Sequence, residues 1–262
     1  MPPMPAEPAA AAEIASQPSP FVYEDTAATR AGIAAVSKRL AGGTIAIIGL
    51  GGTGSEVLDL ISKTPCQRIL LFDGDRVEQH TAWRAPGAMP WGTIVLGPYK
   101  VEHYAEVYSR MHKGILIYRE DLTPDNIYLL DDVDFVFVCV DSVRARAFII
   151  PELERRDLPF IDCGLGLRLV GDCVMGQVRV TTSTPAMRAH VHEGSRIPVA
   201  GRDDDELYRS NIQVACLNRL AATLAVIQYK QLRGFYADSE AEYHCVYSVD
   251  GNTIVNADRA DT

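Results

Sequence analysis

The sequence predicts an α/β protein with a Rossmann-like, mostly parallel β-sheet flanked by helices, an antiparallel extension and a C-terminal hairpin. Three observations support this prediction. An apolar run at residues 44–48 leads directly into a glycine cluster, which is typical of a buried parallel strand, a tight turn and a helix. Apolar strands then alternate with helical segments as far as residue 163. After residue 164 the pattern changes to strand-like stretches that are typical of antiparallel pairing.

Composition narrows the class of protein. The chain has 262 residues, 47% of them apolar, which is enough for a sizeable core. Its six cysteines are scattered without a CxxC pair. We therefore expect no structural zinc and no secreted disulfide framework, and we expect the reducing cytoplasm as its location. The net charge is −9 without a Lys/Arg block, and no apolar run approaches about 20 residues. We expect neither nucleic acid nor a membrane as a partner.

The chain is predicted to have two parts. Residues 1–19 are rich in Ala and Pro and are predicted to be a disordered tail, whereas residues 20–262 form one folded domain. A helix is expected at residues 26–40, ended by a glycine pair. Because a Rossmann-like core does not need a helix before its first strand, Arg30 on this helix is a candidate functional residue. A solvated surface arginine is the more common interpretation.

The glycine cluster is the strongest local signal. Gly49, Gly51 and Gly54 follow the GxGxxG spacing of a dinucleotide site. Glycines let a ligand approach the backbone, and the N–H groups of a helix start favour a phosphate. Asp73 follows the next predicted strand, residues 68–72, where a ribose-binding carboxylate is expected. The alternative is a close helix–strand packing turn without a ligand.

A second group of candidates follows this strand. Asp73 and Asp75 flank a glycine, an arrangement that suits a ribose, a metal or a simple acidic turn. A long loop at residues 80–92 holds both tryptophans, and such loops lie at the carboxyl edge of a parallel sheet, where ligands bind. Lys100 opens the next helix, which we expect to reach residue 111. A cation is unfavourable in a first helical turn unless an anion is bound, so Lys100 is a candidate phosphate ligand.

The alternating pattern continues to residue 163. We expect a strand at 115–118, a helix near 124–130 and a fully apolar strand at 135–140. Asp141 ends that strand, where it is either the N-cap of the helix at 142–154 or a ligand of Mg²⁺. A last strand of this series is expected at 159–163.

The C-terminal third has a different organisation. Residues 171–182 are predicted to form a strand, and residues 183–208 a polar crossover loop that is too long to be a silent connector. An apolar helix is expected at 208–232, buried and at a subunit interface. Strands at 243–249 and 253–255 flank an Asp-Gly-Asn hairpin signal.

Across residues 21–234 the chain resembles the ThiF/MoeB/HesA superfamily of ubiquitin-activating-enzyme-like adenylyltransferases. The doubled glycine of the loop, completed by Gly52 and Ser55, is similar to the nucleotide loop of that family. Asp73 matches its ribose-binding aspartate, in a D-x-D motif with Asp75. The resemblance implies that these residues bind the nucleotide.

Further matches follow in the order of the family. Its Asn-x-x-Arg motif corresponds here to Thr81 and Arg84, so the arginine is kept and the asparagine is replaced. Lys100 matches the phosphate-binding lysine and Asp141 the Mg²⁺-binding aspartate. Arg30 resembles, by position, an N-terminal arginine that reaches the partner's ATP in homodimeric members.

The resemblance implies an ATP-dependent adenylyltransferase of the ubiquitin-like modifier activating type. In such a reaction the C-terminal carboxylate of a ubiquitin-like or sulfur-carrier protein attacks the α-phosphate of ATP. Arg30, Arg84, Lys100 and a Mg²⁺ held by Asp141 would neutralise and align the reacting anions. It also implies a homodimer.

A thioester step is not expected. Many members capture the acyl group on a cysteine in or near the crossover loop, but residues 183–205 contain none. Cys163 and Cys173 lie on predicted strands and Cys216 in the apolar helix, and buried thiols are poor nucleophiles. Cys216 is the best remaining candidate because it lies near the start of its helix.

Two other functions stay open from the residues. An NAD(P)-dependent oxidoreductase fits the glycine spacing and Asp73 but leaves Arg84, Lys100 and Asp141 unexplained. A degenerate, non-catalytic module that binds a ubiquitin-like protein fits the replacement at Thr81, although the four retained site residues argue against it.

Overall fold

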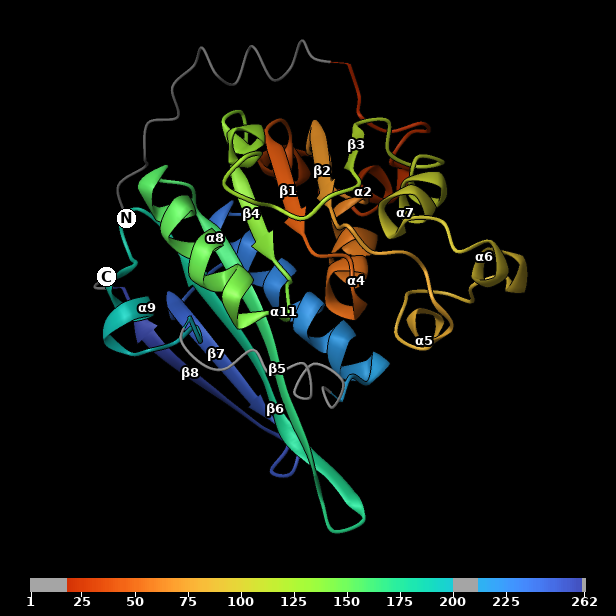
Figure 1. Ribbon diagram of the computed structural model, residues 1–262. Coiled ribbons are helices and arrows are strands. Elements are labelled where there is room, and N and C mark those ends of the chain that lie inside the picture. Colours follow the sequence, from red (N-terminus) through yellow and green to blue (C-terminus); the bar gives the residue numbers. More distant parts are fainter. Residues whose placement is uncertain (1–17, 200–211, 261–262) are drawn as a thin grey trace, which may run out of the picture.

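The computed structural model describes residues 18–199 and 212–260, and within them a single sheet crosses the molecule (Figure 1). Its strands lie in the order β3-β2-β1-β4-β5-β6-β7-β8. The bounds are β1 (Thr44–Ile48), β2 (Arg68–Phe72), β3 (Ile115–Tyr118), β4 (Phe135–Val138), β5 (Phe160–Val170), β6 (Cys173–Ser183), β7 (Glu242–Ser248) and β8 (Thr253–Arg259). Pairing is parallel from β3 to β5 and antiparallel from β5 to β8. The predicted fold class and the C-terminal hairpin are thereby confirmed.

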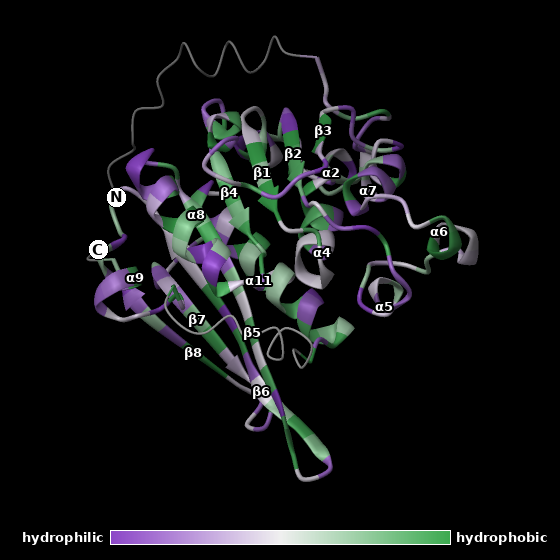
Figure 2. Ribbon diagram, viewed as in Figure 1, coloured by the Kyte–Doolittle hydropathy of each residue, from purple (hydrophilic) through white to green (hydrophobic). Residues whose placement is uncertain are grey.

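Helices cover both faces of the parallel part. The first face carries α4 (Gly52–Ile61), α7 (Lys100–Tyr108) and α11 (Ala215–Leu232), and the second α8 (Val143–Arg155) and the 3₁₀ helix η2 (Ile127–Leu130). Successive residues of a strand point to opposite faces. In β1, Ile45 and Ile47 therefore pack on the first face, and Ala46 and Ile48 on the second. Figure 2 shows the hydrophobic colouring of these central strands between the helical layers.

The topology creates a crevice beside β1. From β1 the chain moves outward through β2 and β3 and then returns to β4 on the other side of β1. In open α/β sheets, ligands bind at such a switch point, outside the carboxyl ends of the strands. The glycine loop that connects β1 to α4 lies at this point.

The N-terminal helix is shorter than predicted. The expected helix at residues 26–40 is divided into α2 (Thr26–Arg30), α3 (Ala34–Ser37) and the 3₁₀ helix η1 (Lys38–Leu40). Gly32 has φ +71°, a left-handed conformation that ends α2. The long loop also forms two short helices, α5 (Gln79–Ala82) and α6 (Trp91–Leu96).

Other boundaries also differ from prediction. β4 ends at Val138 rather than residue 140, α7 ends at Tyr108 rather than residue 111, and β8 ends at Arg259 rather than residue 255. β5 does not end at residue 163 but continues to Val170, because β6 pairs with it along its whole length. α11 begins at Ala215, so the predicted start at 208 is wrong for residues 212–214, which are not helical, while 208–211 lie outside the described residues. Residues 1–17 of the predicted tail at 1–19 and residues 200–208 of the predicted loop at 183–208 also lie outside them. The described start of that loop includes α9 (Ala189–Glu193).

None of the described helices has the length and hydropathy needed to cross a bilayer.

Candidate functional site

The glycines of the loop occupy their positions for different structural reasons. Gly49 has φ +87°, and its N–H donates to the carbonyl of Phe72 at 2.8 Å. A Cβ at Gly54 would overlap the carbonyl oxygen of Gly49, so this glycine permits close packing of α4 on the loop. A Cβ at Gly51 would meet nothing within 4 Å. Gly51 thus leaves open space at the N-cap of α4, where backbone N–H groups face outward.

A cavity of about 910 Å³ lies beside this loop at the carboxyl ends of the strands. Most of the predicted site residues line it, namely Gly49, Gly51, Gly52, Asp73, Asp75, Arg84, Lys100 and Asp141. Three do not: Gly54 and Ser55 lie beneath the loop, and Arg30 is exposed on α2. The Ser55 hydroxyl donates to the carbonyl of Gly52 at 3.1 Å and so supports the loop from below.

Asp73 holds the loop and the lysine together. One carboxylate oxygen accepts the Leu50 N–H at 2.6 Å, and the other accepts the Asp75 N–H at 2.9 Å. The ammonium of Lys100 lies 3.4 Å from Asp73 and 2.6 Å from Asp75. Burial raises the pKa of Asp73, and the charge of Lys100 opposes this rise. Burial by itself would lower the pKa of Lys100, but the carboxylates of Asp73 and Asp75 outweigh it, so the pKa of Lys100 is raised. The lysine is therefore a fully charged cation at the cavity wall.

Arg84 brings a second cation to the cavity. Its Nε is buried and has no hydrogen-bond partner among the residues that the structure describes. Unpaired buried donors are rare because they are costly, so this atom is available to an anionic ligand. Thr81 is buried and lies outside the cavity lining. Its hydroxyl accepts the Glu78 N–H at 3.2 Å and caps α5.

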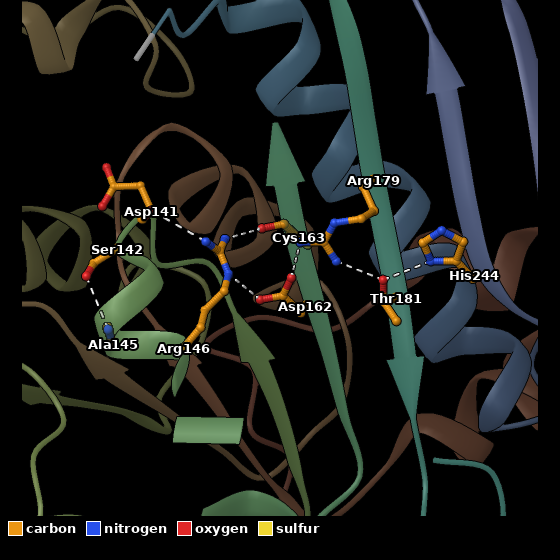
Figure 3. Close-up of polar contacts among 9 residues, drawn as sticks. All are labelled: Asp141, Ser142, Ala145, Arg146, Asp162, Cys163, Arg179, Thr181 and His244. Atoms are coloured by element: carbon orange, nitrogen blue, oxygen red, sulfur yellow. Dashed lines mark hydrogen bonds and ion pairs between the residues drawn. The ribbon is translucent and has the colours of Figure 1, made fainter. Parts of the chain in front are cut away.

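Asp141 lies three residues after the end of β4, so it does not end the strand as predicted, and it is exposed at the cavity. Ser142 and not Asp141 is the N-cap of α8, since the Ser142 hydroxyl accepts the Ala145 N–H at 3.1 Å. Figure 3 shows the Asp141 carboxylate directed away from Arg146. No cluster of three metal-ligating side chains occurs within 18–199 and 212–260. Mg²⁺ commonly binds one or two carboxylates and completes its shell with substrate phosphates and water, and Asp141 fits that requirement.

The two ends of the cavity differ in chemistry. The apolar wall is formed by residues that follow β3 and β4 or lie on α8, namely Leu122, Pro124, Val140, Ala145 and Phe148. The polar wall includes Gln177 and Arg179 on β6, two strands beyond β4. Sequence reasoning missed Arg146 and Arg179, which line the cavity, and Asp162, which joins them. Asp162 lies within the buried part of β5, residues 160–163, and an acid inside an apolar predicted strand was the available signal, but nothing in the pattern marked Arg179.

Two of the cysteines are exposed although the sequence predicted that they are buried. Cys139 and Cys163 line the cavity, and the neighbouring Cys163 thiol and burial raise the pKa of Cys139 well above its usual value. Cys173 and Cys216 are exposed, so the expectation that they are buried is wrong. Cys173 lies on the part of β6 that extends beyond β7, and Cys216 lies in the first turn of α11.

The fold and the site define a Rossmann-like α/β protein whose glycine loop opens onto a cavity at the switch point of its sheet. The chain belongs to the ThiF family, whose sequence pattern matches residues 23–250. The resemblance drawn from the glycine loop and the strand-end residues is thereby confirmed.

Curated relatives and solved structures agree with this assignment. The chain is 25% identical to ubiquitin-like modifier-activating enzyme 5 of Drosophila persimilis over 143 residues, which are 49% of this chain and 36% of the relative. It is 27% identical to tRNA threonylcarbamoyladenosine dehydratase of Escherichia coli K12 over 124 residues, 46% of this chain and 45% of the relative. The crystal structure of E. coli MccB with ATP shares the fold with a TM-score of 0.62 at 16% identity, covering 87% of this chain and 67% of MccB. The chain thus spans less than half the length of these curated relatives.

Proposed function

We propose that this protein uses ATP to adenylate the C-terminal carboxylate of a ubiquitin-like or sulfur-carrier protein. A carboxylate oxygen forms a bond to the α-phosphorus of ATP while the bond from that phosphorus to the bridging oxygen breaks. The products are an acyl-adenylate and pyrophosphate. The observation that carries this proposal is the arrangement of the glycine loop, two cations and Asp141 around one cavity.

The cavity offers a matching surface to each part of ATP. The apolar wall suits the base, and the carboxylate of Asp73 is an acceptor for ribose hydroxyls. The open space at Gly51 lets a phosphate approach the backbone N–H groups at the start of α4. This order of base, ribose and phosphate directs the α-phosphate towards the polar end of the cavity.

The reaction joins two anions, so charge neutralisation is the main requirement. Lys100 is held by Asp73 and Asp75, and the unpaired Nε of Arg84 is ready to donate to a phosphate. Asp141 would hold Mg²⁺, which supplies charge neutralisation to the pyrophosphate leaving group when it is bound. Fixed cations in a partly desolvated cavity need little reorganisation when the substrate arrives.

The relatives support the class of substrate. One is named as an enzyme that activates a ubiquitin-like modifier, and MccB has been crystallised with ATP. We extend the proposal to a homodimer, in which Arg30 would reach the cavity of the partner subunit. All six cysteines are free thiols, which fits the expected cytoplasmic location.

Thermal denaturation with different nucleotides tests the proposal. Mg-ATP and AMP should raise the melting temperature of the wild type, whereas NAD⁺ and NADP⁺ should not. ATP–pyrophosphate exchange in the presence of ubiquitin-like proteins then tests adenylation itself. Stabilisation by NAD⁺ but not by ATP would instead identify the oxidoreductase, and binding of a ubiquitin-like protein without exchange would identify a non-catalytic module.

A further inference from the structure

The polar end of the cavity contains a cation whose position is specified by the backbone. Arg179 on β6 lies directly opposite Gly164 on β5 in the antiparallel ladder. A Cβ at position 164 would lie 2.5 Å from Nη2 of Arg179 and 3.1 Å from its Cζ. The guanidinium therefore lies across the face of β5, in space that only glycine leaves open.

Hydrogen bonds fix the orientation of this guanidinium (Figure 3). Its Nη2 donates to Oδ2 of Asp162 at 2.5 Å, and its Nη1 donates to Oγ1 of Thr181 at 2.8 Å. Thr181 in turn lies 3.0 Å from Nδ1 of His244 on β7. Side chains from β5, β6 and β7 thus hold Arg179 in one place, which is the kind of support that a binding residue needs.

The charges of this cluster do not cancel. Asp162 is fully buried, and its other oxygen accepts Nε–H of Arg146 at 2.8 Å. Two arginines share one carboxylate, so the three side chains carry one excess positive charge. The Asp141 carboxylate acts electrostatically on Arg146, whose hydrogen bond goes to the Asp141 carbonyl, and Arg179 has Asp162 as its ion-pair partner. A structural ion pair needs only one arginine, and an uncompensated charge at a partly buried site is costly unless an anion binds there.

The excess charge faces the cavity at Arg179. Arg146 is buried and donates to the carbonyls of Asp141 and Cys163 as well as to Asp162, so its donors are directed at protein atoms. The side chain of Arg179 is 17% exposed and lines the cavity. A partly desolvated guanidinium binds a carboxylate more strongly than an exposed one does, because the local dielectric is low.

The position of Arg179 indicates which anion it receives. The nucleotide is matched by the apolar wall, the glycine loop, Arg84 and Lys100, whereas Arg179 comes from β6, two strands beyond β4. Arg146 links the carbonyl of Asp141 to Asp162, so one guanidinium and one carboxylate separate Asp141 from Arg179. An anion at Arg179 is therefore beside the nucleotide but is not part of it.

We propose that Arg179 is a substrate-binding residue that receives the carboxylate group that the enzyme activates, with Asp162 and Gly164 as its positioning residues. The inference rests on the proposed adenylation and adds to it the binding site of the second substrate. It predicts a preference for substrates with a free carboxylate over the matching amides before any chemistry takes place.

NMR titration tests the site directly. The probes are glycylglycine, which has a free carboxylate, and glycylglycinamide, each added to the wild type saturated with AMP so that no turnover occurs. Glycylglycine should shift the Arg179 Nε–H resonance and bind at least about tenfold more tightly than the amide, since charge-assisted hydrogen bonds are the strong ones. Equal binding of the two probes, or no shift at Arg179, overturns the proposal without the need for any variant.

Variants of Arg179 provide a second test of the site. Arg179→Gln should weaken glycylglycine binding about tenfold or more and leave AMP affinity unchanged. Arg168→Gln is the matched control, because Arg168 is exposed on the same strand pair outside the cavity and should bind as the wild type does. If Arg179→Gln does not fold, Arg179→Lys replaces it in the test, because lysine keeps the positive charge beside Asp162. Lysine lacks the paired donors of the guanidinium, so glycylglycine should still bind more weakly.

The two proposals fail in different ways. If AMP does not bind the wild type, the adenylation proposal fails, whatever the dipeptides do. If AMP binds and Arg179→Gln retains the wild-type preference for the carboxylate, the assignment of Arg179 fails and the adenylation proposal stands.

Discussion

The ammonium group of Lys100 lies 3.4 Å from the carboxylate of Asp73, and both side chains are only 7% exposed. Asp75, the second partner of the lysine, is 61% exposed. A buried contact thus anchors the lysine from one side and an exposed contact holds it from the other. A phosphate that enters the cavity can displace Asp75 while Asp73 keeps the lysine in place.

Replacing this lysine tests that relationship. Lys100→Met should destabilise the fold by about 3 kcal/mol, because the buried charge of Asp73 loses its cation, and nucleotide binding should fall at least about tenfold. Thermal denaturation with and without Mg-ATP measures both effects. Lys63→Met is the matched control, since Lys63 makes an exposed pair with Asp59. A Lys100→Met protein with wild-type stability and wild-type nucleotide binding would contradict this account.

The loop glycines should separate folding from binding. Gly54→Ala places a methyl group against the carbonyl of Gly49 and should cost about 2 kcal/mol or more of stability. Gly51→Ala has free space and should cost about 1 kcal/mol or less, as an N-cap change. Its methyl group should nevertheless weaken AMP binding about tenfold by blocking the phosphate. Calorimetric titration of AMP measures this, and wild-type affinity in Gly51→Ala would show that no phosphate lies at Gly51.

Asp141 should affect nucleotide binding only when Mg²⁺ is present. Asp141→Asn should lose most of the thermal stabilisation by Mg-ATP, because it removes the carboxylate that would hold Mg²⁺. Stabilisation by AMP without Mg²⁺ should remain. Asp172→Asn, in the exposed turn between β5 and β6, serves as the control. An equal loss of Mg-ATP and AMP binding in Asp141→Asn would count against a role in metal binding.

His244 should make stability sensitive to acid. Burial and the nearby Arg196 and Arg179 lower the pKa of His244 to about 4. The pKa of His244 in the folded protein lies below its ordinary value of about 6.5. The contribution of neutral His244 to the free energy of unfolding is therefore fully present above pH 6.5 and is lost as the pH falls towards 4. It amounts to at most about 3 kcal/mol, because one pKa unit corresponds to about 1.4 kcal/mol.

Urea unfolding between pH 4 and pH 7 measures this dependence. His244→Gln cannot be protonated and should show a shallower loss of stability in this range than the wild type. Asp258 also lies near His244, and its pKa is lowered by Arg196 despite the opposing effect of burial. Because His244 and Asp258 act on each other electrostatically, the difference in slope between the two proteins reports the pair. Identical slopes would mean that His244 is not buried in its neutral form.

The thiols should fall into two classes. Cys173 and Cys216 are exposed, whereas the other four are buried or partly buried. A thiol-specific disulfide reagent should react rapidly with two thiols in the native protein and with all six in denaturant. Modification of Cys163 or Cys139 at the rate of the exposed pair would show that the cavity wall opens.

Much of the fold could be predicted because its signals are local. The apolar run of β1, the glycine turn and the start of α4 are consecutive in the chain, and local backbone chemistry dictates their shape. Strand-end residues such as Asp73 and Asp141 could be placed together because parallel strands end at one edge. The division of the N-terminal helix was missed, although Gly32 was its signal, and the start of α11 was predicted too early.

The sequence by itself therefore determined the Rossmann-like core, the glycine loop and membership of the ThiF family. Only the tertiary structure decided that Arg179 lies over Gly164 and shares Asp162 with Arg146. That arrangement depends on the antiparallel register of β5 and β6, and a shift of one residue would turn Arg179 to the other face of the sheet. Register follows from side-chain packing along the whole strand pair and leaves no local motif, which is why this end of the cavity was not predicted.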